Sequence, residues 1–269
     1  MIRKIMLVFT IVGLLILATP ASAVTFGQPD NGQHPYVGLA VFYAHGAPQW
    51  RCSGTLMTPT VFLTAGHCTS DGGATPIDSA QVWFDEHVTT ASGYPNSGGV
   101  TGTPIPHPNW TGGLTVPNTH DVGVVILNTA VTDKGFGKLA PAGYLDGLAT
   151  QRGQQDVSFT VVGYGLQEVK PRFSALRDRL KATVKLVNLT SLLTDGYNIQ
   201  TSNDPGKAHR GGTCFGDSGG PVFAGGFESN LVVGVNSFVL NENCKGAAFA
   251  HRTDIADTLN FLAQFGVTP

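Results

Sequence analysis

The hydrophobic positions of this chain fall into short runs that turn residues separate from one another. The clearest runs span residues 36–42, 61–64, 122–127, 159–162 and 231–235. Short apolar runs bounded by glycine, proline, asparagine and aspartate are typical of buried β-strands. The chain contains 35 glycines and 16 prolines, which supply the breaks. The pattern predicts an all-β fold, and it fits a β-sandwich as well as a β-barrel.

One helix is predicted near the C-terminal end. Ile255, Leu259 and Leu262 share a helical face, Asp254 is a candidate N-cap, and Gly266 can end the helix. Elsewhere, residues 92–103 are rich in glycine, proline and serine, so we expect a surface loop there.

Residues 1–23 have the pattern of a secretory signal peptide. Arg3 and Lys4 precede an apolar stretch at residues 5–18, and Ala21-Ser-Ala23 forms a small-residue cleavage site. The alternative is an uncleaved membrane anchor, but the apolar stretch is short for a bilayer span of about 20 residues. We therefore expect a secreted protein of residues 24–269 that is not in a membrane once the signal has been removed.

The charge balance excludes some classes of partner. Without Arg3 and Lys4, 14 of the 16 basic residues remain to face 18 acidic residues. A mildly acidic chain of this kind lacks the basic surface that nucleic acids and anionic membranes attract. We expect neither as a partner.

Three residues in separate segments suggest nucleophilic catalysis. Ser218 lies in the glycine-rich segment 212–221, His67 in 63–68 and Asp121 in 118–127. A serine hydroxyl is a weak nucleophile unless a base activates it and a third group orients that base. His67 is the candidate base because histidine titrates near neutral pH. His120, next to Asp121, is its competitor.

Five motifs together resemble the chymotrypsin/trypsin-like serine proteases. They are Cys52-Ser-Gly-Thr-Leu, Thr64-Ala-Gly-His-Cys68, His120-Asp-Val-Gly-Val-Val-Ile-Leu127, Val162-Gly-Tyr-Gly165 and Gly216-Asp-Ser-Gly-Gly-Pro221. The resemblance implies two six-stranded antiparallel β-barrels packed together with a C-terminal α-helix, and a crossover between barrels within residues 134–155. It also favours His67 over His120 as the base.

The resemblance assigns a role to each candidate. It implies that Ser218 attacks a peptide bond to form an acyl-enzyme, that His67 is the general base, and that Asp121 orients it. The backbone N–H groups of Gly216 and Ser218 would form the oxyanion hole. This chemistry requires no metal or organic cofactor, and its substrates would be proteins or peptides.

The cysteines lie at positions 52, 68, 214 and 244. Four cysteines allow three pairings, and the sequence alone does not choose among them. The resemblance implies the pairs Cys52–Cys68 and Cys214–Cys244. A Cys/His metal site is the alternative, but the chain lacks compact Cys-x-x-Cys spacing.

The segment after the predicted cleavage site departs from the family pattern. Family members mostly begin Ile-Val-Gly-Gly after a propeptide is cut, whereas this chain has Val24-Thr-Phe-Gly27. We hypothesise that signal removal itself frees the amine of Val24, which then pairs with Asp217. The alternative is that Val24 simply begins a strand. The short signal and the lack of a propeptide suggest a bacterial source.

The specificity pocket also departs from that of trypsin. Family members that cleave after Arg or Lys have an aspartate six residues before the nucleophile, and this chain has Gly212. A buried cationic side chain would have no counter-charge there. The pocket wall, Ser237-Phe-Val239, resembles that of elastases, in which a bulky residue narrows the entrance. We therefore expect a small or medium apolar residue before the cleaved bond.

Two other functions compete with a protease. A catalytically inactive binding protein on the same fold would be expected to lack a member of the triad, and this chain keeps all three. An esterase is suggested by the spacing of Gly216-Asp-Ser-Gly-Gly220, but that motif belongs to a fold whose chain order is Ser, Asp, His. We expect a monomer, and the resemblance allows a protein inhibitor as a partner.

Overall fold

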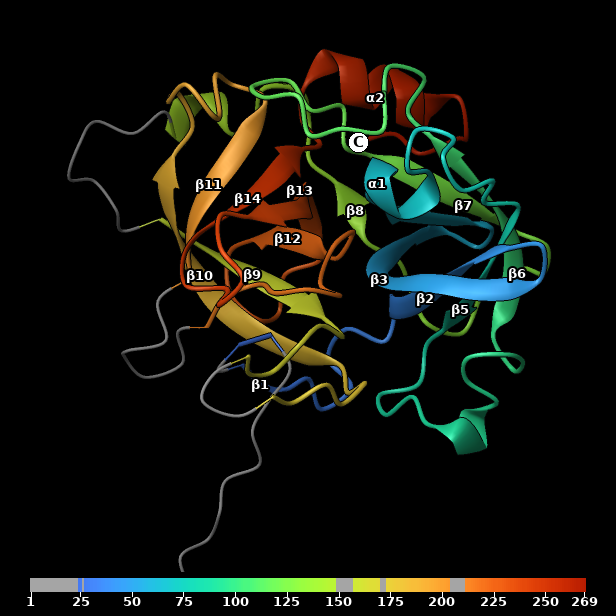
Figure 1. The fold of residues 1–269 in the computed structure, drawn as a ribbon. Helices are drawn as coiled ribbons and strands as arrows, with labels where there is room; N and C mark the ends of the chain where they lie inside the picture. Colours follow the sequence, from blue (N-terminus) through green and yellow to red (C-terminus); the bar gives the residue numbers. More distant parts are fainter. Residues whose placement is uncertain (1–23, 26, 149–156, 170–172, 204–210) are drawn as a thin grey trace, which may run out of the picture.

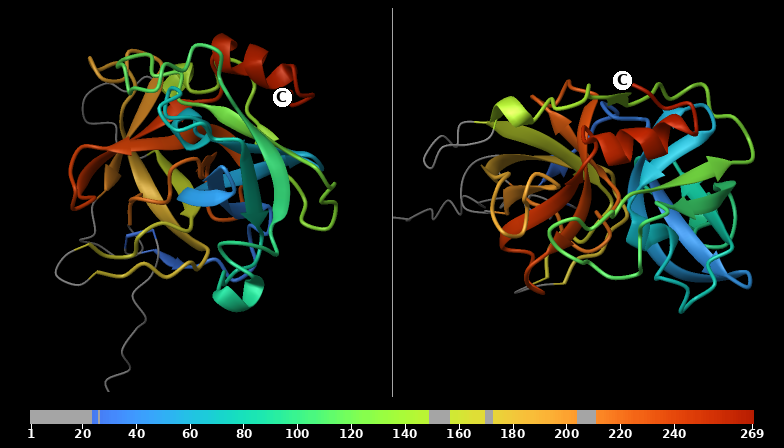
Figure 2. Two further views of the ribbon diagram at one scale, coloured as in Figure 1. Left: turned by 45° about the vertical axis from the view of Figure 1, so that its right-hand side comes forward. Right: turned by 90° about the horizontal axis from the view of Figure 1, so that it is seen from above.

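Two β-barrels lie side by side in the computed structural model, and a helix crosses the top of the junction between them (Figures 1 and 2). The structure describes residues 24–25, 27–148, 157–169, 173–203 and 211–269. The predicted signal peptide, residues 1–23, lies outside the described residues.

The first barrel is a closed ring of six antiparallel strands in the order β2-β3-β4-β7-β6-β5. Every neighbouring pair is antiparallel, and β2 bonds to both β3 and β5. The strands are β2 (Val37–Ala44), β3 (Ala47–Thr58), β4 (Val61–Thr64), β5 (Ser79–Trp83), β6 (Val100–Pro106) and β7 (Gly123–Leu127).

The second barrel closes because β9 pairs with β10 as well as with β12. Its six strands are β9 (Ser158–Gly163), β10 (Leu180–Asn188), β11 (Asn198–Asn203), β12 (Pro221–Ala224), β13 (Leu231–Val239) and β14 (Gly246–Arg252). Two short strands extend the sheet. They are β1 (Gln28–Pro29), antiparallel to β10, and β8 (Lys138–Leu139), parallel to β13. The predicted two-barrel fold is confirmed.

The five apolar runs all form strands, namely β2, β4, β7, β9 and β13. The predicted loop at residues 92–103 is partly wrong. A short 3-10 helix, η1 (Thr90–Ser92), ends at the first residue of this segment, and β6 already begins at Val100. Gly102 is a strand residue because the backbone of β7 passes close by: an added Cβ would lie 2.6 Å from the oxygen of Ile126. Glycine there permits close strand packing rather than a turn.

The C-terminal helix is α2 (Ala256–Ala263), and it follows the predicted position. The predicted cap is wrong. Ile255 is the N-cap, and no side chain caps the helix. The carboxylate of Asp254 instead binds Arg252 at 2.8 Å and accepts the N–H of Leu145 at 2.8 Å. The helix ends before Gly266, which has a φ of +77°.

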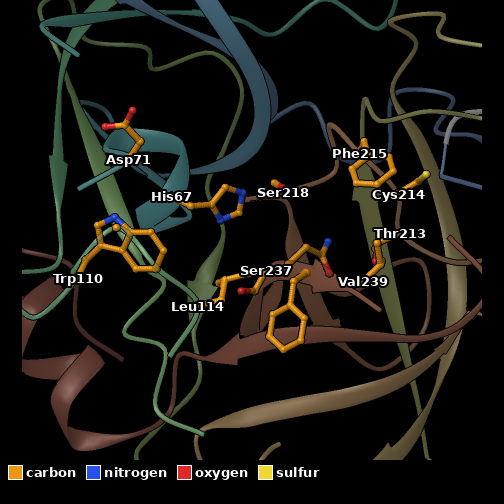
Figure 3. A pocket seen from close by; sticks show the side chains of 13 residues that line it. His67, Asp71, Trp110, Leu114, Thr213, Cys214, Phe215, Ser218, Ser237 and Val239 are labelled. Carbon is orange, nitrogen blue, oxygen red and sulfur yellow. The ribbon is translucent and has the colours of Figure 1, made fainter. Parts of the chain in front are cut away.

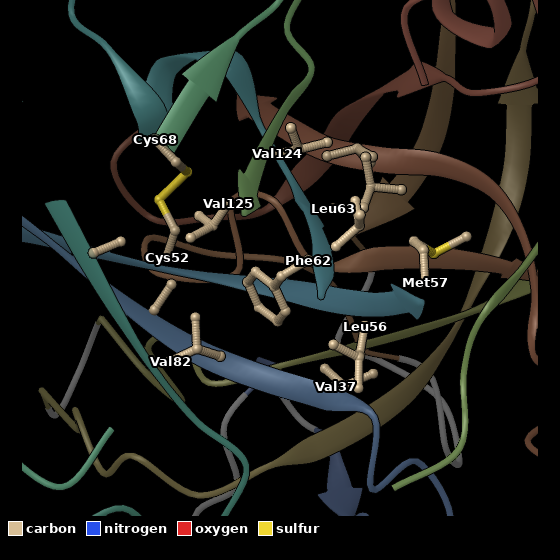
Figure 4. Packing of buried hydrophobic residues seen from close by; sticks show 14 of the residues in the cluster. Val37, Cys52, Leu56, Met57, Phe62, Leu63, Cys68, Val82, Val124 and Val125 are labelled. Atoms are coloured by element: carbon tan, nitrogen blue, oxygen red, sulfur yellow. A yellow bond between two sulfur atoms is a disulfide. The ribbon is translucent and has the colours of Figure 1, made fainter. Parts of the chain in front are cut away.

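A hydrophobic core fills each barrel, and the larger one continues across the junction. Phe62 lies in the middle of the first core, with Val37, Leu56 and Val125 around it (Figure 4). From the second barrel, Phe223 and other buried residues join the same cluster. This continuity fixes the two barrels against each other.

A buried polar seam adds to this junction. Arg179, just before β10, forms a 2.9 Å salt bridge with Asp30 and donates to the backbone oxygens of Val37 and Phe84 at 3.2 and 3.0 Å. The hydroxyl of Tyr164 donates to the Asp85 oxygen at 2.7 Å. The seam ties the second barrel to the first.

The segment linking the barrels leaves β7 at Leu127 and enters β9 at Ser158. It contains β8 and the 3-10 helix η2 (Asp146–Leu148), and residues 149–155 of the predicted crossover lie outside the described residues. Among the described residues, no helix has the length and apolar character needed to cross a membrane.

Candidate active site

A cavity of about 520 Å³ lies between the barrels. It contains His67 from the first barrel and Ser218 from the second, so two of the three predicted catalytic residues face one space (Figure 3). In Figure 3, Trp110 and Asp71 lie on one side of His67, and Thr213 and Val239 lie on the other. Ser237, Phe238, Asn236, Leu114, Cys214, Phe215 and Gly112 complete the lining.

His67 lies in α1 (Gly66–Thr69), the short helix that follows β4. Its backbone N–H donates to Asp121 Oδ1 at 2.8 Å, and its ring Nδ1 lies 2.9 Å from Asp121 Oδ2. Because the carboxylate only accepts, Nδ1 is the donor, and Nε2 remains free for the cavity. Burial lowers the pKa of His67, but the charge and hydrogen bond of Asp121 outweigh it, so the pKa is raised above 6.5.

Asp121 lies just before β7 and is completely buried. Burial raises the pKa of its carboxyl group, but the charge of His67 and hydrogen bonds from His67 and Ser237 together lower it below the ordinary value. The carboxylate therefore stays ionised beside the imidazole. His120, the competing histidine, turns away and binds Asp257 at 2.8 Å.

Ser237 is a partner of Asp121 that sequence reasoning missed. Its hydroxyl donates a hydrogen bond to Asp121 Oδ2, across a separation of 116 residues. The sequence places Ser237 only in the pocket wall, and no spacing signal connects it with Asp121. The structure shows that it lines the cavity and also holds the carboxylate.

Ser218 lies in the loop before β12, and this loop is tied to both barrels. Its carbonyl oxygen accepts the N–H of Ser53 on β3 at 2.8 Å. Within the described residues, the Ser218 hydroxyl makes no hydrogen bond to His67. Such bonds are often long without substrate and shorten in the reacting complex. The structure thus brings base and candidate nucleophile to one cavity before the bond between them has formed.

The backbone at Gly216 has the conformation that only glycine adopts easily, with a φ of +95°. Its carbonyl oxygen is fixed by Ser53 Oγ at 2.8 Å. Neither Gly216 nor Ser218 donates its backbone N–H to another described residue. Both N–H groups are therefore available to a bound oxygen atom.

The two disulfides implied by the resemblance are both present. Cys52–Cys68 joins β3 to α1, one residue after His67, and Cys214–Cys244 joins the Ser218 loop to the turn before β14. In the chain-entropy model, closing a loop of about 15 residues contributes on the order of 3 kcal/mol. Each disulfide thus constrains a segment that carries a candidate catalytic residue.

Asp217 is fully buried beside the Ser218 loop. Its oxygens accept the N–H groups of Gly165 and Cys214 at 2.8 and 2.9 Å. Burial outweighs these bonds and raises the pKa of the carboxyl group to about 7. Val24 is also buried, and Thr25 pairs with Gly212 through backbone and side-chain hydrogen bonds. In the uncut chain the Val24 nitrogen is part of a peptide bond, so its pairing with Asp217 stays a prediction.

Of the three predicted pocket residues, two line the cavity and one does not. Ser237 and Val239 line the cavity, but Gly212 does not. A Cβ on Gly212 would lie 2.2 Å from Asn203 Oδ1, so the side chain of Asn203 occupies that space. Asn203 is held there by the oxygen of Thr213 at 2.7 Å and its N–H at 3.1 Å. The neutral amide of Asn203 thus fills the space that a side chain at position 212 would need.

Two groups of described residues bring candidate metal ligands close together. In one, Cys52 and Cys68 are joined as a disulfide and offer no thiolate. In the other, His107 Nδ1 accepts the N–H of Asn109 at 3.2 Å, so the proton of a neutral ring lies on Nε2, which faces Asp257 at 3.6 Å. His120 hydrogen-bonds to Asp257 of α2 at 2.8 Å and its ring stacks on that of His107, an arrangement that suits a structural contact better than metal binding.

Comparisons with known proteins agree with this geometry. The chain is 26% identical over 253 residues to Serine protease 1 of Drosophila melanogaster, covering 89% of this chain and 84% of that protein. It is 27% identical over 192 residues to Trypsin delta of the same species, covering 70% and 68%. The structure of HL collagenase superposes with a TM-score of 0.66 at 19% identity, covering 91% of this chain and 98% of that one.

The model of the Trypsin family matches residues 25–261, which is most of the chain and includes both barrels. His67, Asp121 and Ser218 all fall within the matched segment, and the superposed solved structure shows the same fold. The chain therefore belongs to the trypsin family and is a serine-type endopeptidase.

Proposed function

We propose that the protein hydrolyses peptide bonds through a covalent acyl-enzyme on Ser218. The observation that carries this proposal is the bond between His67 Nδ1 and buried Asp121, which leaves Nε2 directed to the cavity that contains Ser218. His67 takes the proton of the Ser218 hydroxyl as its oxygen attacks the carbonyl carbon. The same proton then passes to the leaving amine. A water molecule then attacks the carbonyl carbon of the acyl-enzyme while His67 takes a proton from it. His67 passes this proton to the Ser218 oxygen as the acyl group leaves.

The free N–H groups of Gly216 and Ser218 would hold the oxyanion that forms in each step. Preorganised donors of this kind need no reorganisation when the charge develops. The positive φ of Gly216 supports this role, because a side chain would strain the conformation that leaves its N–H available.

Two alternatives are less well supported. A catalytically inactive binding protein would gain nothing from an ionised buried acid aligned with a histidine. An esterase would use the same nucleophile, and we expect low activity on activated esters in any case. Family membership favours peptide bonds as the substrate class.

Covalent labelling tests the proposal directly. The purified protein is treated with a fluorophosphonate probe, digested, and the adduct located by mass spectrometry. We expect one adduct, on Ser218, because only an activated serine reacts rapidly. A folded protein that hydrolyses no peptide and takes up no probe would contradict the proposal and support the inactive binding protein.

For the residue before the cleaved bond, we propose a small or medium uncharged side chain. The neutral amide of Asn203 lies against Gly212, and Val239 lies in the cavity wall; together they support a short pocket with no counter-charge among the described residues around Gly212. The sequence alone predicts an apolar residue, whereas the cavity also contains the polar side chains of Thr213 and Asn236. A peptide library with strong preference for Arg or Lys would contradict a neutral pocket.

We further propose that the secreted form begins at Val24 and that its free amine pairs with Asp217. Burial raises the pKa of the Asp217 carboxyl group to about 7, so its ionised form is disfavoured. A nearby ammonium group would stabilise that ionised form. The expected result is a mature N-terminus at Val24 and a several-fold lower kcat/KM when one alanine is retained before it. N-terminal sequencing and peptide hydrolysis check both. An active form that begins elsewhere would contradict the proposal.

Secretion, a monomeric state and a protein inhibitor as partner also remain proposals. Two disulfides support an oxidising compartment, because such bonds are rare in the reducing cytosol. Fractionation of the producing cells, and the mass of the native protein in solution, test the first two.

A further inference from the structure

We propose that Asn236 selects the substrate by a hydrogen bond, so that the enzyme prefers glutamine or asparagine directly before the cleaved bond. The inference rests on the proposed function of Ser218 and narrows it to one substrate class. It starts from Asn236, a residue that lines the cavity and whose buried amide nitrogen has no hydrogen-bond partner among the described residues.

The position of Asn236 is fixed relative to the nucleophile. Its backbone N–H donates to the oxygen of Gly220 at 2.9 Å, and its carbonyl oxygen accepts the N–H of Gly219 at 2.8 Å. These two glycines directly follow Ser218. The backbone of Asn236 is therefore held at a fixed place beside the Ser218 loop, and the residue lines the same cavity as Ser218.

The amide is buried and incompletely bonded. Asn236 is 4% exposed, and its Nδ2 has no hydrogen-bond partner among the described residues. Leaving a buried donor unpaired destabilises a protein, and such groups are rare unless water or a ligand completes them. Half a turn of the amide exchanges its nitrogen and oxygen, so the group can present either a donor or an acceptor to the cavity.

The surroundings favour a neutral polar substrate group. Gly212 brings no charge, the neutral amide of Asn203 lies behind it, and the hydroxyl of Ser237 is already bonded to Asp121. Asp71 lies on the far side of His67 (Figure 3). Around Asn236, the described residues would thus leave a desolvated substrate ammonium or carboxylate without a counter-charge. An apolar side chain would leave the Asn236 amide unpaired, whereas a carboxamide carries both a donor and an acceptor.

Peptides that differ only in the residue before the cut provide the test. Glutamine is compared with methionine, and asparagine with leucine, because each pair has nearly the same size and shape. We expect kcat/KM for the carboxamide to exceed that for its apolar counterpart by about tenfold or more. In Asn236→Leu the preference should fall by at least the same factor or reverse, and in the control Asn260→Leu, on the exposed face of α2, it should not change.

The outcomes separate the inference from the function it rests on. Fluorophosphonate labelling of Ser218 verifies that each variant is folded and active, and Asn236→Ala replaces Asn236→Leu where the larger side chain prevents folding. A wild-type enzyme that labels but cleaves the apolar peptides equally well overturns the role of Asn236. So does an unchanged preference in a variant that labels. Absence of both cleavage and labelling overturns the proposed function itself.

Discussion

Replacing Ser218 with alanine is expected to lower kcat/KM for peptide hydrolysis by roughly 10⁵- to 10⁶-fold. The oxygen that forms the acyl-enzyme would be missing, while substrate binding and the oxyanion hole would remain. Because these remaining features act on binding and on the developing charge, some catalysis over the reaction in water should persist. Initial rates on a peptide substrate, together with the loss of fluorophosphonate labelling, measure the effect.

The matched control for this variant is Ser229→Ala. Ser229 lies in the turn between β12 and β13, where its hydroxyl accepts the N–H of Leu231 at 3.2 Å and bonds to no other described residue. Its loss should leave kcat/KM unchanged. Thermal unfolding should show that Ser218→Ala is folded, since the loop is held by the backbone of Ser218 rather than by its hydroxyl. A folded Ser218→Ala that retains wild-type rates would identify a different nucleophile.

The sequence predicts those parts of the site that depend on short motifs. His67, Asp121 and Ser218 each lie in a local pattern; the fold brings His67 and Ser218 to one cavity and places Asp121 behind His67. The disulfide pairing followed from the family resemblance, not from the spacing of the cysteines. Family motifs therefore carry information about residues that are distant in sequence.

Features that depend on how distant segments pack could not be predicted. The bond from Ser237 to Asp121 requires β13 to pass beside the start of β7, across the junction of the barrels. The side chain of Asn203, the last residue of β11, fills the space beside Gly212 only because it points toward that glycine. Neither contact leaves a pattern in the chain, because each depends on a strand position that the whole barrel sets.

Local signals misled where tertiary contacts outweighed them. Asp254 precedes a helix and has the chemistry of an N-cap, yet a salt bridge with Arg252 and the N–H of Leu145 take up its carboxylate. The segment 92–103 has the composition of a loop, yet its residue Gly102 lies within β6, between β5 and β7. At Asp254 the competing interaction comes from side-chain and backbone groups nearby in space, and at Gly102 it comes from pairing with the neighbouring strands.

Replacing Asp121 with asparagine should lower kcat/KM by about 10⁴-fold on the high-pH plateau of its pH profile, where His67 is neutral. The overall shape of the site should be preserved, but an amide can donate its N–H to Nδ1 of His67. That would place the imidazole proton on Nε2, where the base must instead accept the proton of Ser218. Peptide hydrolysis at a pH well above the pKa of His67 measures this loss.

The same variant should also change the pH dependence, which a merely structural defect would not do. His67 acts as a base only when neutral, so activity is lost as the pH falls through its pKa. In the wild type that pKa is raised above 6.5, because the carboxylate of Asp121 outweighs the effect of burial. Without the carboxylate, burial acts unopposed and lowers the pKa, so the acid limb of kcat/KM should shift to lower pH.

A second histidine–aspartate pair serves as the control. His87 Nδ1 lies 2.9 Å from Asp178 Oδ1 at an exposed position outside the cavity. Asp178→Asn removes a carboxylate from a histidine in the same way, and it should change neither the plateau nor the acid limb. An Asp121→Asn enzyme with a reduced plateau but an unshifted acid limb would show that His67 is not the group whose protonation limits the rate. The activity would then depend on a different base, and the role of the His67–Asp121 bond would be limited to shaping the cavity.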